Sequence, residues 1–345
     1  MRICLICSYA SDSHLSWAKN FKLNSQHQVD LITLPGRFWK LRMQTSGMEA
    51  ASIIKKENNE CDLFLVTSFL NVAEFKGFLP TEYHHIPIHL YFHENQFAYP
   101  ISSNDPDQRS ERLQHYQFIQ IKSFLSADKV YFNSNYNKQT FLQGAKQLLR
   151  QLPEKNNEMI KELDQKNTQL WYLQVPSPEC RKVKSKEIIL LWNHRWEEDK
   201  NPDGFIEVLR KFRQKKISFQ LIITGKESKL QSYKNTLLEF NKEIIHHGNV
   251  SSRDKYLELL GLATHSIITS HHDFFGLSAI EGVLFGVKTL FPKRLVYPEH
   301  FSKETWQKIS YDSIDDITEK MHHYPLEDAM RDLQKYNTFK DIDSL

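Results

Sequence analysis

Histidine and glutamate stand directly after a short apolar run in the first third of this sequence. The run "IPIHLYF" has the length of a β-strand, and it is followed by His93, Glu94, Asn95 and Gln96. Ligands of parallel sheets bind at the carboxyl ends of the strands, so we interpret these residues as part of a site. The alternative is a histidine that is hydrogen-bonded for structural reasons. The helical zinc motif H-E-x-x-H does not occur here, because position 97 holds Phe97.

A second polar stretch, "WNHRWEEDKNP", places Arg195 and Lys200 beside a helix start marked by Asn201 and Pro202. Free backbone N–H groups and the positive end of the helix dipole would add to the two side-chain charges. The stretch therefore predicts a site for a phosphate or diphosphate. The alternative is a set of surface ion pairs with the three acidic residues at 197–199.

A third stretch, "HDFFGLSAIEG", begins with a carboxylate at Asp273 and continues into a helix after Gly276. The glycine allows a close approach of the backbone, and Glu281 would lie about one and a half turns inside the helix. Backbone N–H groups could bind one ligand group, and a carboxylate could accept two hydrogen bonds from neighbouring hydroxyls. A diphosphate joined to a ribose has that shape. Phe274 and Phe275 are expected to belong partly to the core.

The elements that position these stretches alternate between strand-like runs and helix-period segments, which predicts βα units on parallel sheets. We expect an α/β protein with a first domain at 1–178, a linker at 179–186 that is rich in basic residues and follows two prolines, and a second domain at 187–345. The expected strands are 2–8, 29–35, 61–68, 86–92, 129–134 and 171–175, then 188–193, 218–225, 243–250, 265–270 and 288–292. The expected helices begin near 14, 44, 111, 137, 202, 231, 254, 276 and 311, and one more ends at 78.

Composition excludes several classes of protein. Apolar residues make up 40% of the chain and the formal net charge is +3, which is typical of a folded globular protein. No apolar run approaches the roughly 20 residues of a membrane span, and the start lacks a secretory signal, so we expect a cytoplasmic protein. Basic clusters such as Arg37, Lys40 and Arg42 could contact nucleic acid or could simply be solvated surface.

Some apparent motifs are not expected to carry function. Cys4 and Cys7 form a C-x-x-C, but in a strand this spacing sends the side chains to opposite faces. Asp105-Pro106-Asp107 resembles a metal-binding D-x-D, and we interpret it as a turn. Neither G-x-G-x-x-G nor a P-loop motif occurs, so dinucleotide oxidoreductases and P-loop enzymes are not indicated.

Taken together, the three stretches resemble the retaining GT-B glycosyltransferases of the family 4 type. More narrowly, the chain resembles the tRNA-queuosine alpha-mannosyltransferases, also called the glycosyltransferase-like domain-containing protein 1 family. The resemblance rests on "YFHENQFAYP", "FNSNYN", "HRWEEDKNP", "HDFFGLSAIEG" and "RLVYPEHF", which occur in this order across nearly the whole chain. It implies two Rossmann-like domains that face an interdomain cleft.

The resemblance also implies a reaction. The donor would be GDP-mannose, and the acceptor would be a hydroxyl on the cyclopentene ring of queuosine in a tRNA anticodon, that of tRNA-Asp. No metal or other cofactor is expected. The implied catalytic residues are His93, Glu94, Arg195 and Lys200. The implied donor-binding residues are Ser13, His14, Asn133, Ser134, Asp273, Phe275, Gly276, Leu277 and Glu281.

The sequence departs from the family pattern in two places, and two other functions stay open. Ser11 and Asp12 replace a pair of glycines before His14, and Asp273 replaces a longer glutamate. Both departures affect the identity of the sugar and the acceptor more than the class of reaction. One alternative is a transferase that acts on a lipid or polysaccharide acceptor. The other is a non-catalytic RNA-binding module.

Overall fold

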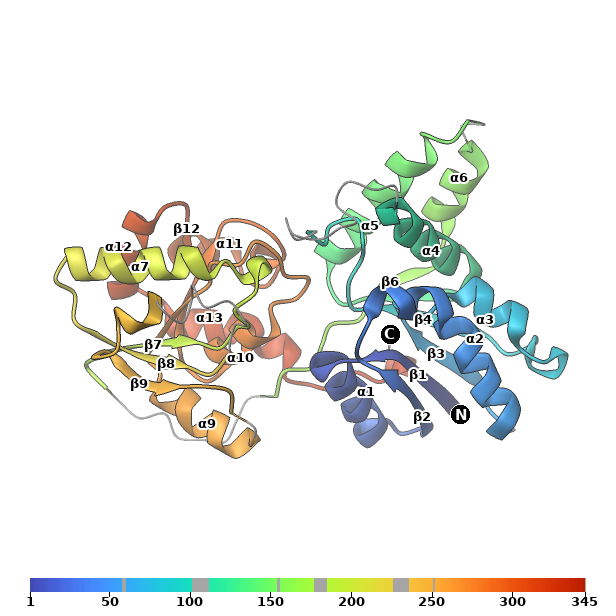
Figure 1. Cartoon of the computed structure of the whole chain (residues 1–345), viewed down its shortest axis with the longest axis horizontal. Coiled ribbons are helices and arrows are strands. Elements are labelled where there is room, and N and C mark those ends of the chain that lie inside the picture. Colours follow the sequence, from blue (N-terminus) through green and yellow to red (C-terminus); the bar gives the residue numbers. More distant parts are fainter. Residues whose placement is uncertain are drawn as a thin grey trace. The chain divides into compact units, whose positions relative to one another are not determined.

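The computed structural model describes residues 1–57, 60–100, 112–153, 156–176, 185–225, 236–250 and 252–344. The chain forms two compact units, each built around its own sheet (Figure 1). The first unit comprises Met1–Leu173 together with Phe339–Leu345, and the second comprises Gln174–Thr338. Within the described ranges, no helix combines the length and the apolar character that crossing a membrane requires.

The first unit contains a six-stranded parallel sheet with the strand order β2-β1-β3-β4-β5-β6. Every residue of β3 is buried, as expected for a parallel strand that is covered on both faces. The strands are β1 (Arg2–Ala10), β2 (Gln28–Pro35), β3 (Leu63–Thr67), β4 (Ile88–Phe92), β5 (Lys129–Phe132) and β6 (Thr168–Leu170).

Helices supply the two apolar cores on the faces of this sheet. Cys4 lies in the core on one face and Cys7 in the core on the other, which confirms that the C-x-x-C side chains diverge. Burial raises the pKa of both thiols. The described helices are α1 (Asp12–Asn24), α2 (Trp39–Glu57), α3 (Val72–Phe78), α4 (Arg112–Ser126), α5 (Asn135–Leu149) and α6 (Asn157–Gln165), with short 3-10 turns η1 (Thr81–Tyr83) and η6 (Ile342–Ser344).

The second unit contains another six-stranded parallel sheet, with the order β12-β11-β10-β7-β8-β9. Its strands are β7 (Ile188–Trp192), β8 (Phe219–Ile223), β9 (Ile244–His247), β10 (His265–Ile267), β11 (Lys288–Pro292) and β12 (Ser310–Tyr311). Its described helices are α7 (Pro202–Gln214), α9 (Arg253–Leu262), α10 (Leu277–Leu284), α11 (Lys303–Ile309), α12 (Ile314–His322) and α13 (Leu326–Leu333), with η3 (Glu198–Lys200), η4 (Tyr297–Glu299) and η5 (Gln334–Tyr336).

Each sheet has a point at which the strand order reverses. In the first unit, β1 lies between β2 and β3, and in the second unit β7 lies between β8 and β10. The loops that leave two such neighbouring strands diverge to opposite faces and open a crevice at the carboxyl edge of the sheet. The polar stretches after β7 and β10 are therefore brought to one place within the second unit.

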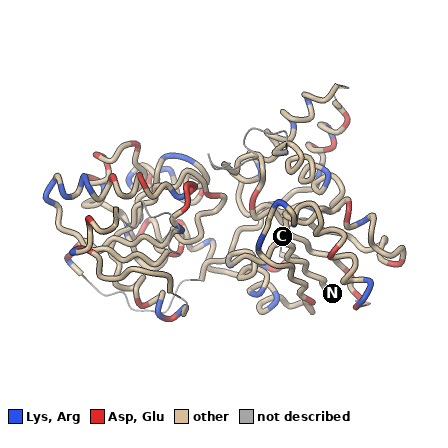
Figure 2. Tube along the Cα trace, in the orientation of Figure 1, with Lys and Arg blue, Asp and Glu red and all other residues tan. Residues whose placement is uncertain are grey.

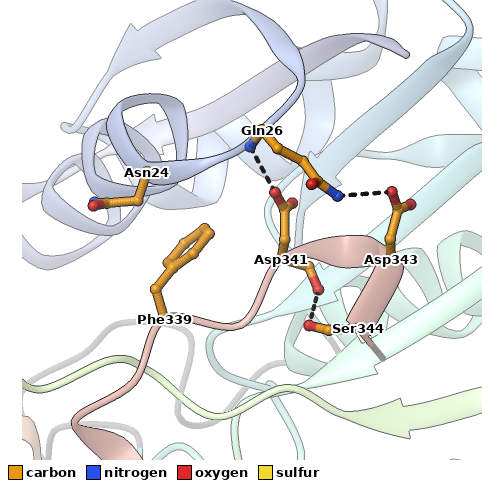
Figure 3. A pocket seen from close by; sticks show the side chains of 6 residues that line it. All are labelled: Asn24, Gln26, Phe339, Asp341, Asp343 and Ser344. Atoms are coloured by element: carbon orange, nitrogen blue, oxygen red, sulfur yellow. Dashed lines mark hydrogen bonds between the residues drawn. The ribbon is translucent and has the colours of Figure 1, made fainter.

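The C-terminal segment packs on the first unit, whereas the sequence assigned all of 187–345 to the second domain. Phe339, Asp341 and Asp343 face Asn24 and Gln26 across an open pocket (Figure 3). Asp341 accepts a hydrogen bond from the Gln26 backbone N–H at 2.8 Å. The segment is held by side-chain and backbone contacts that have no periodic signal in the sequence.

A second difference concerns the strand expected at 171–175. The sheet ends instead with β6, and Trp171 turns its ring into the core while its Nε1 donates to the Lys340 carbonyl at 3.1 Å. The apolar character of this run therefore serves packing against the C-terminal segment. The proposed linker at 179–186, the helix start at 231 and the turn at 105–107 lie wholly or mostly outside the described residues.

Candidate active site

Two of the three polar stretches lie in the second unit, and Lys200 joins them. Its ammonium donates to Asp273 Oδ1 at 2.8 Å and to the His272 carbonyl at 2.9 Å, and it lies 3.3 Å from Asp199 Oδ2. An ammonium has three hydrogens, so these three acceptors match its capacity. The residues that follow β7 and β10 are thus held together by one largely buried cation.

Backbone contacts fix the same two loops. Asn201 has a positive φ of 51°, and its side chain accepts from the Gly204 N–H at 3.1 Å, which caps α7. The hydroxyl of Thr269 donates to the Asn201 carbonyl at 2.9 Å. The backbone N–H of His271 donates to the Asp199 carbonyl at 2.8 Å. The position of Lys200 is therefore set by several bonds besides its own.

The electrostatics of this pair favour full ionisation. Burial alone would raise the pKa of Asp273, but the charge of Lys200 and hydrogen bonds from Lys200 and Tyr297 lower that pKa to about 2. Burial would lower the pKa of Lys200, but the charges of Asp273 and Asp199 outweigh it and raise that pKa. Both groups are therefore charged at neutral pH.

Gly276 starts α10 beside this pair. Its φ of +72° lies in the left-handed region, and a Cβ at this position would lie 2.8 Å from Tyr297 Cε1. No side chain caps the helix start. The Ala279 N–H donates to the Gly276 carbonyl at 3.0 Å, which leaves the N–H groups of Leu277 and Ser278 for an anion.

His194 lies against the same turn, with its Nδ1 3.3 Å from the Ser278 hydroxyl. The ring is 5% exposed, and among the described residues its Nε2 has no hydrogen-bond partner. Burial, with the nearby charge of Lys200, lowers its pKa to about 4, so the ring is neutral at pH 7. A buried, neutral imidazole with an unused nitrogen is suited to hydrogen-bond a ligand.

Arg195 and Glu281 lie farther from the Lys200–Asp273 pair. The guanidinium of Arg195 is 52% exposed, 3.1 Å from Glu197 Oε2 and 3.7 Å from Asp199 Oδ2, as the ion-pair alternative described. Glu281 accepts from the guanidinium of Arg253. The structure thus brings Lys200 and Asp273 into contact and links Arg195 to them through Asp199. Glu281 lies in α10, the helix that follows Asp273, and pairs there with Arg253.

The remaining predicted residues of this unit divide between core and surface. Phe275 is 3% exposed and its ring packs against His300 and Tyr336, so it belongs more fully to the core than expected, and its contact with a donor stays a prediction. Leu277 is 37% exposed at the start of α10. Sequence reasoning missed His194 and Tyr297 as site residues, although both lie within the stretches that carry the family resemblance.

In the first unit, His14 and His93 form a stacked pair. Their ring centroids are 4.2 Å apart with an interplanar angle of 18°. His14 Nε2 lies 4.0 Å from Glu94 Oε2, and the rings of Trp17 and His93 form a T-shaped pair with centroids 4.9 Å apart. Burial lowers the pKa of His14 to about 4 and holds the pKa of His93 well below its usual range, so both rings are neutral at pH 7. Among the described residues, the buried Nε2 of His93 has no partner.

Three asparagines hold the loop that carries His93. Asn133 Nδ2 donates to the His93 carbonyl at 2.8 Å. Asn137 Nδ2 donates to the Phe92 carbonyl at 3.1 Å and to Asn133 Oδ1 at 2.8 Å, and Asn137 Oδ1 accepts from Asn95 at 2.8 Å. Asn137 is fully buried and ties the ends of β4 and β5 to the loop. Sequence reasoning did not single it out.

Two other predicted residues of this unit, Ser134 and Ser13, lie in or beside helices. Ser134 is fully buried, and its hydroxyl accepts from the Asn137 N–H at 3.0 Å and so caps α5. Ser13 lies in α1, next to His14 in the sequence. Asn133 and Ser134 therefore organise the loop ends, and their contact with a donor stays a prediction. In the described part of the chain, no group of three or more His, Cys, Asp or Glu residues could hold a metal ion.

The fold resembles that of known sugar transferases. A sucrose-phosphate synthase from Thermosynechococcus elongatus superposes with a TM-score of 0.71 at 11% identity, over 98% of this chain and 95% of that one. A glycosyltransferase from Rickettsia africae superposes with a TM-score of 0.62 at 17% identity, over 98% and 94%. Two Rossmann-like units of parallel sheet with this likeness define the GT-B fold, and the chain is a glycosyltransferase.

Sequence comparison identifies the family more narrowly. Residues 2–174 match the model of the tRNA-queuosine alpha-mannosyltransferase N-terminal domain, and residues 178–337 match that of the glycosyl transferases group 1. A tRNA-queuosine alpha-mannosyltransferase from Drosophila melanogaster is 30% identical over 314 residues, which span 86% of this chain and 79% of that protein. The chain belongs to the tRNA-queuosine alpha-mannosyltransferase family.

Proposed function

We propose that the protein transfers mannose from GDP-mannose to a hydroxyl on the cyclopentene ring of queuosine in tRNA, with retention of configuration. The family supports the acceptor, and the relative from Drosophila melanogaster carries that activity in its name. The anticodon of tRNA-Asp is the proposed location of the queuosine. The expected cytoplasmic location stays a prediction that this acceptor supports.

The observation that carries the proposal is the largely buried Lys200–Asp273 pair beside the uncapped start of α10. When the bond between the sugar and the diphosphate breaks, negative charge develops on the leaving GDP. Backbone N–H groups at Gly276 and beyond would stabilise that charge, and the ammonium of Lys200 contributes a fixed positive charge nearby.

Arg195 supplies a second cation that can move. Exposed ion pairs are worth about 1 kcal/mol or less, so the half-exposed guanidinium can exchange Glu197 for a phosphate oxygen at little cost. The acceptor proton would pass to the leaving phosphate on the same face of the sugar, which gives retention. No metal is needed in this scheme.

Carboxylates would bind the hydroxyl groups of the donor. Asp273 accepts from Lys200 and Tyr297, and a carboxylate offers about four acceptor sites, so sites remain for sugar hydroxyls. Glu281 would bind the ribose in place of Arg253. In the first unit, the unused Nε2 of His93 would contact the sugar or the incoming hydroxyl.

The test is release of GDP from GDP-mannose with purified protein and two tRNA preparations, one containing queuosine and one lacking it. We expect turnover and a mass increase of one hexose on the queuosine-containing tRNA alone, with and without EDTA. UDP-glucose serves as the control donor. Equal GDP release with both tRNAs would reject the acceptor, preference for another nucleotide sugar would reject the donor, and loss of turnover in EDTA would reject the metal-free scheme.

A further inference from the structure

A basic and apolar surface lies at the start of α2, outside the groups that the proposed reaction uses. We call Arg37, Phe38, Lys40 and Leu41 the α2 entry surface. Phe38 is 73% exposed and Leu41 is 55% exposed. Residues 36–48 contain no acidic side chain. Large apolar side chains and cations that share an exposed turn indicate an interaction surface.

Phe38 combines an exposed side chain with an unfavourable backbone conformation. Its φ is +56°, in the left-handed region that a bulky residue rarely adopts. Its carbonyl accepts from the N–H groups of Leu41 at 2.9 Å and Arg42 at 3.0 Å and so begins the helix. Strain of this kind persists where the surrounding structure enforces it, and it is found often at functional sites.

Packing connects the α2 entry surface to the stacked histidines. A Cβ on Gly36 would lie 2.5 Å from the backbone nitrogen of Ser11, so the loop after β2 touches the loop that starts α1. The ring of Trp39 lies 6.2 Å from that of Phe69, and Phe69 lies 5.7 Å from the ring of His14. Trp39, the neighbour of the exposed Phe38, is therefore linked to His14 of the candidate site through the ring of Phe69.

Arg37 differs from the basic residues of other clusters in the described part of the chain. Basic and acidic residues are interspersed over the elements of both units (Figure 2). Arg210 pairs with Glu239 and Arg213 with Glu243, whereas Arg37 forms no ion pair with any residue that the structure describes.

We propose that the α2 entry surface binds the acceptor tRNA, with Arg37 on a phosphate and an unstacked base on the ring of Phe38. This proposal rests on the proposed function. Single-stranded RNA loops are recognised by aromatic stacking combined with cations along the backbone, and this surface offers both next to the candidate site. An anionic membrane would also meet cations and apolar side chains, and the experiment separates the two.

The experiment measures tRNA affinity by fluorescence anisotropy and mannose transfer by steady-state kinetics, using the full chain. The variants are Phe38→Ala, Phe38→Gly and Arg37→Glu. Phe78→Ala is the matched aromatic control, since Phe78 is 57% exposed at the end of α3. Lys55→Glu is the matched charge control, since Lys55 is exposed in the last turn of the same helix.

Both Phe38 variants should weaken tRNA binding and raise KM for tRNA about tenfold or more, because one base loses its stacking partner. Arg37→Glu should lower the slope of log Kd against log salt by about one or more. The kcat and the KM for the donor should not change, and both controls should stay within about twofold of the parent. The Tm of Phe38→Gly should equal or exceed that of the parent, because glycine tolerates a positive φ; weaker binding then cannot come from misfolding.

Unchanged tRNA affinity and KM in the Phe38 and Arg37 variants, while the parent still transfers mannose, would overturn this proposal and leave the proposed function intact. A parent that does not discriminate queuosine would overturn the proposed function, and loss of tRNA affinity in the variants would still support an RNA surface. Vesicles of phosphatidylcholine and phosphatidylserine form the last arm. Loss of vesicle binding with unchanged tRNA binding would assign the surface to a membrane and overturn the RNA assignment.

Discussion

Replacing Lys200 by methionine should both destabilise the protein and slow the transfer. The change keeps an unbranched apolar stem but removes the ammonium, which lies 2.8 Å from Asp273 and 3.3 Å from Asp199. The folded state lowers the pKa of Asp273 from 3.8 to about 2. One pKa unit corresponds to about 1.4 kcal/mol, so the net stabilisation of ionised Asp273 is about 2 kcal/mol.

The loss of stability should exceed that value, because burial opposes the charge of Asp273 and only the neighbouring groups offset it. We expect Lys200→Met to cost about 2 to 5 kcal/mol, as for other buried pairs that lose one partner. Asp273→Asn in the same chain should recover much of that stability but none of the transfer. Transfer should slow by roughly a hundredfold or more in both, since the fixed positive charge near the leaving phosphate is lost.

Urea denaturation followed by tryptophan fluorescence measures the stability, and GDP release measures the transfer. Lys308→Met is the matched control, because Lys308 lies 2.9 Å from Glu304 at an exposed position and should matter little. The folded pKa of Asp273 is depressed, so its contribution is present above pH 4 and is lost as the pH falls towards 2. A stability change in Lys200→Met below about 0.5 kcal/mol, or near-normal turnover, would refute the assignment of the pair.

Three further variants address other parts of the site. Gly276→Ala should destabilise the protein by about 1 to 2 kcal/mol and slow transfer, because Gly276 has a positive φ and lies against the ring of Tyr297. Gly77→Ala is the control, because a Cβ at Gly77 would meet nothing within 4 Å. It should be neutral or stabilising in the same urea titration. Asn137→Ala should cost about 2 kcal/mol or more of stability by removing buried hydrogen bonds. It should also lower kcat, because Asn137 holds the loop that carries His93. An unchanged Tm and kcat would contradict this role of Asn137. The pKa of His14 falls from 6.5 to about 4, so the unfolded chain binds more protons below pH 6.5 and stability should fall by about 2 kcal/mol between pH 7 and pH 5 through this group alone. His14→Gln should reduce that pH dependence, and an equal dependence in parent and variant would argue against a buried neutral ring.

Much of the fold follows from local patterns in the sequence. Continuous apolar runs such as that of β3 predict buried parallel strands, because helices cover both faces of a parallel sheet. Gly276 and the Asn201-Pro202 pair predict helix starts, because few residues adopt the backbone conformations found there. The three polar stretches follow the strands β4, β7 and β10, as expected. Lys200 and Asp273, from two of these stretches, are in contact.

Roles that depend on distant partners could not be predicted in this way. The sequence presents His93, Glu94, Asn95 and Gln96 as equivalent polar residues, yet Asn95 is fully buried and bonded to Asn137. The apolar run that begins at Trp171 has the character of a strand, and its ring instead packs against the C-terminal segment. In each case the deciding partner lies far along the chain, and local propensity does not contain it.

The sequence by itself determined the alternation of strands and helices, the ends of the strands that carry polar groups, and the family. Tertiary structure alone decided that Lys200 meets Asp273, 73 residues away, and that Trp39, next to the exposed Phe38, is linked to His14 through the ring of Phe69. The physical reason is the strand order. A parallel sheet brings the carboxyl ends of strands together whatever their separation in the chain, and that order is fixed by packing rather than by any local pattern.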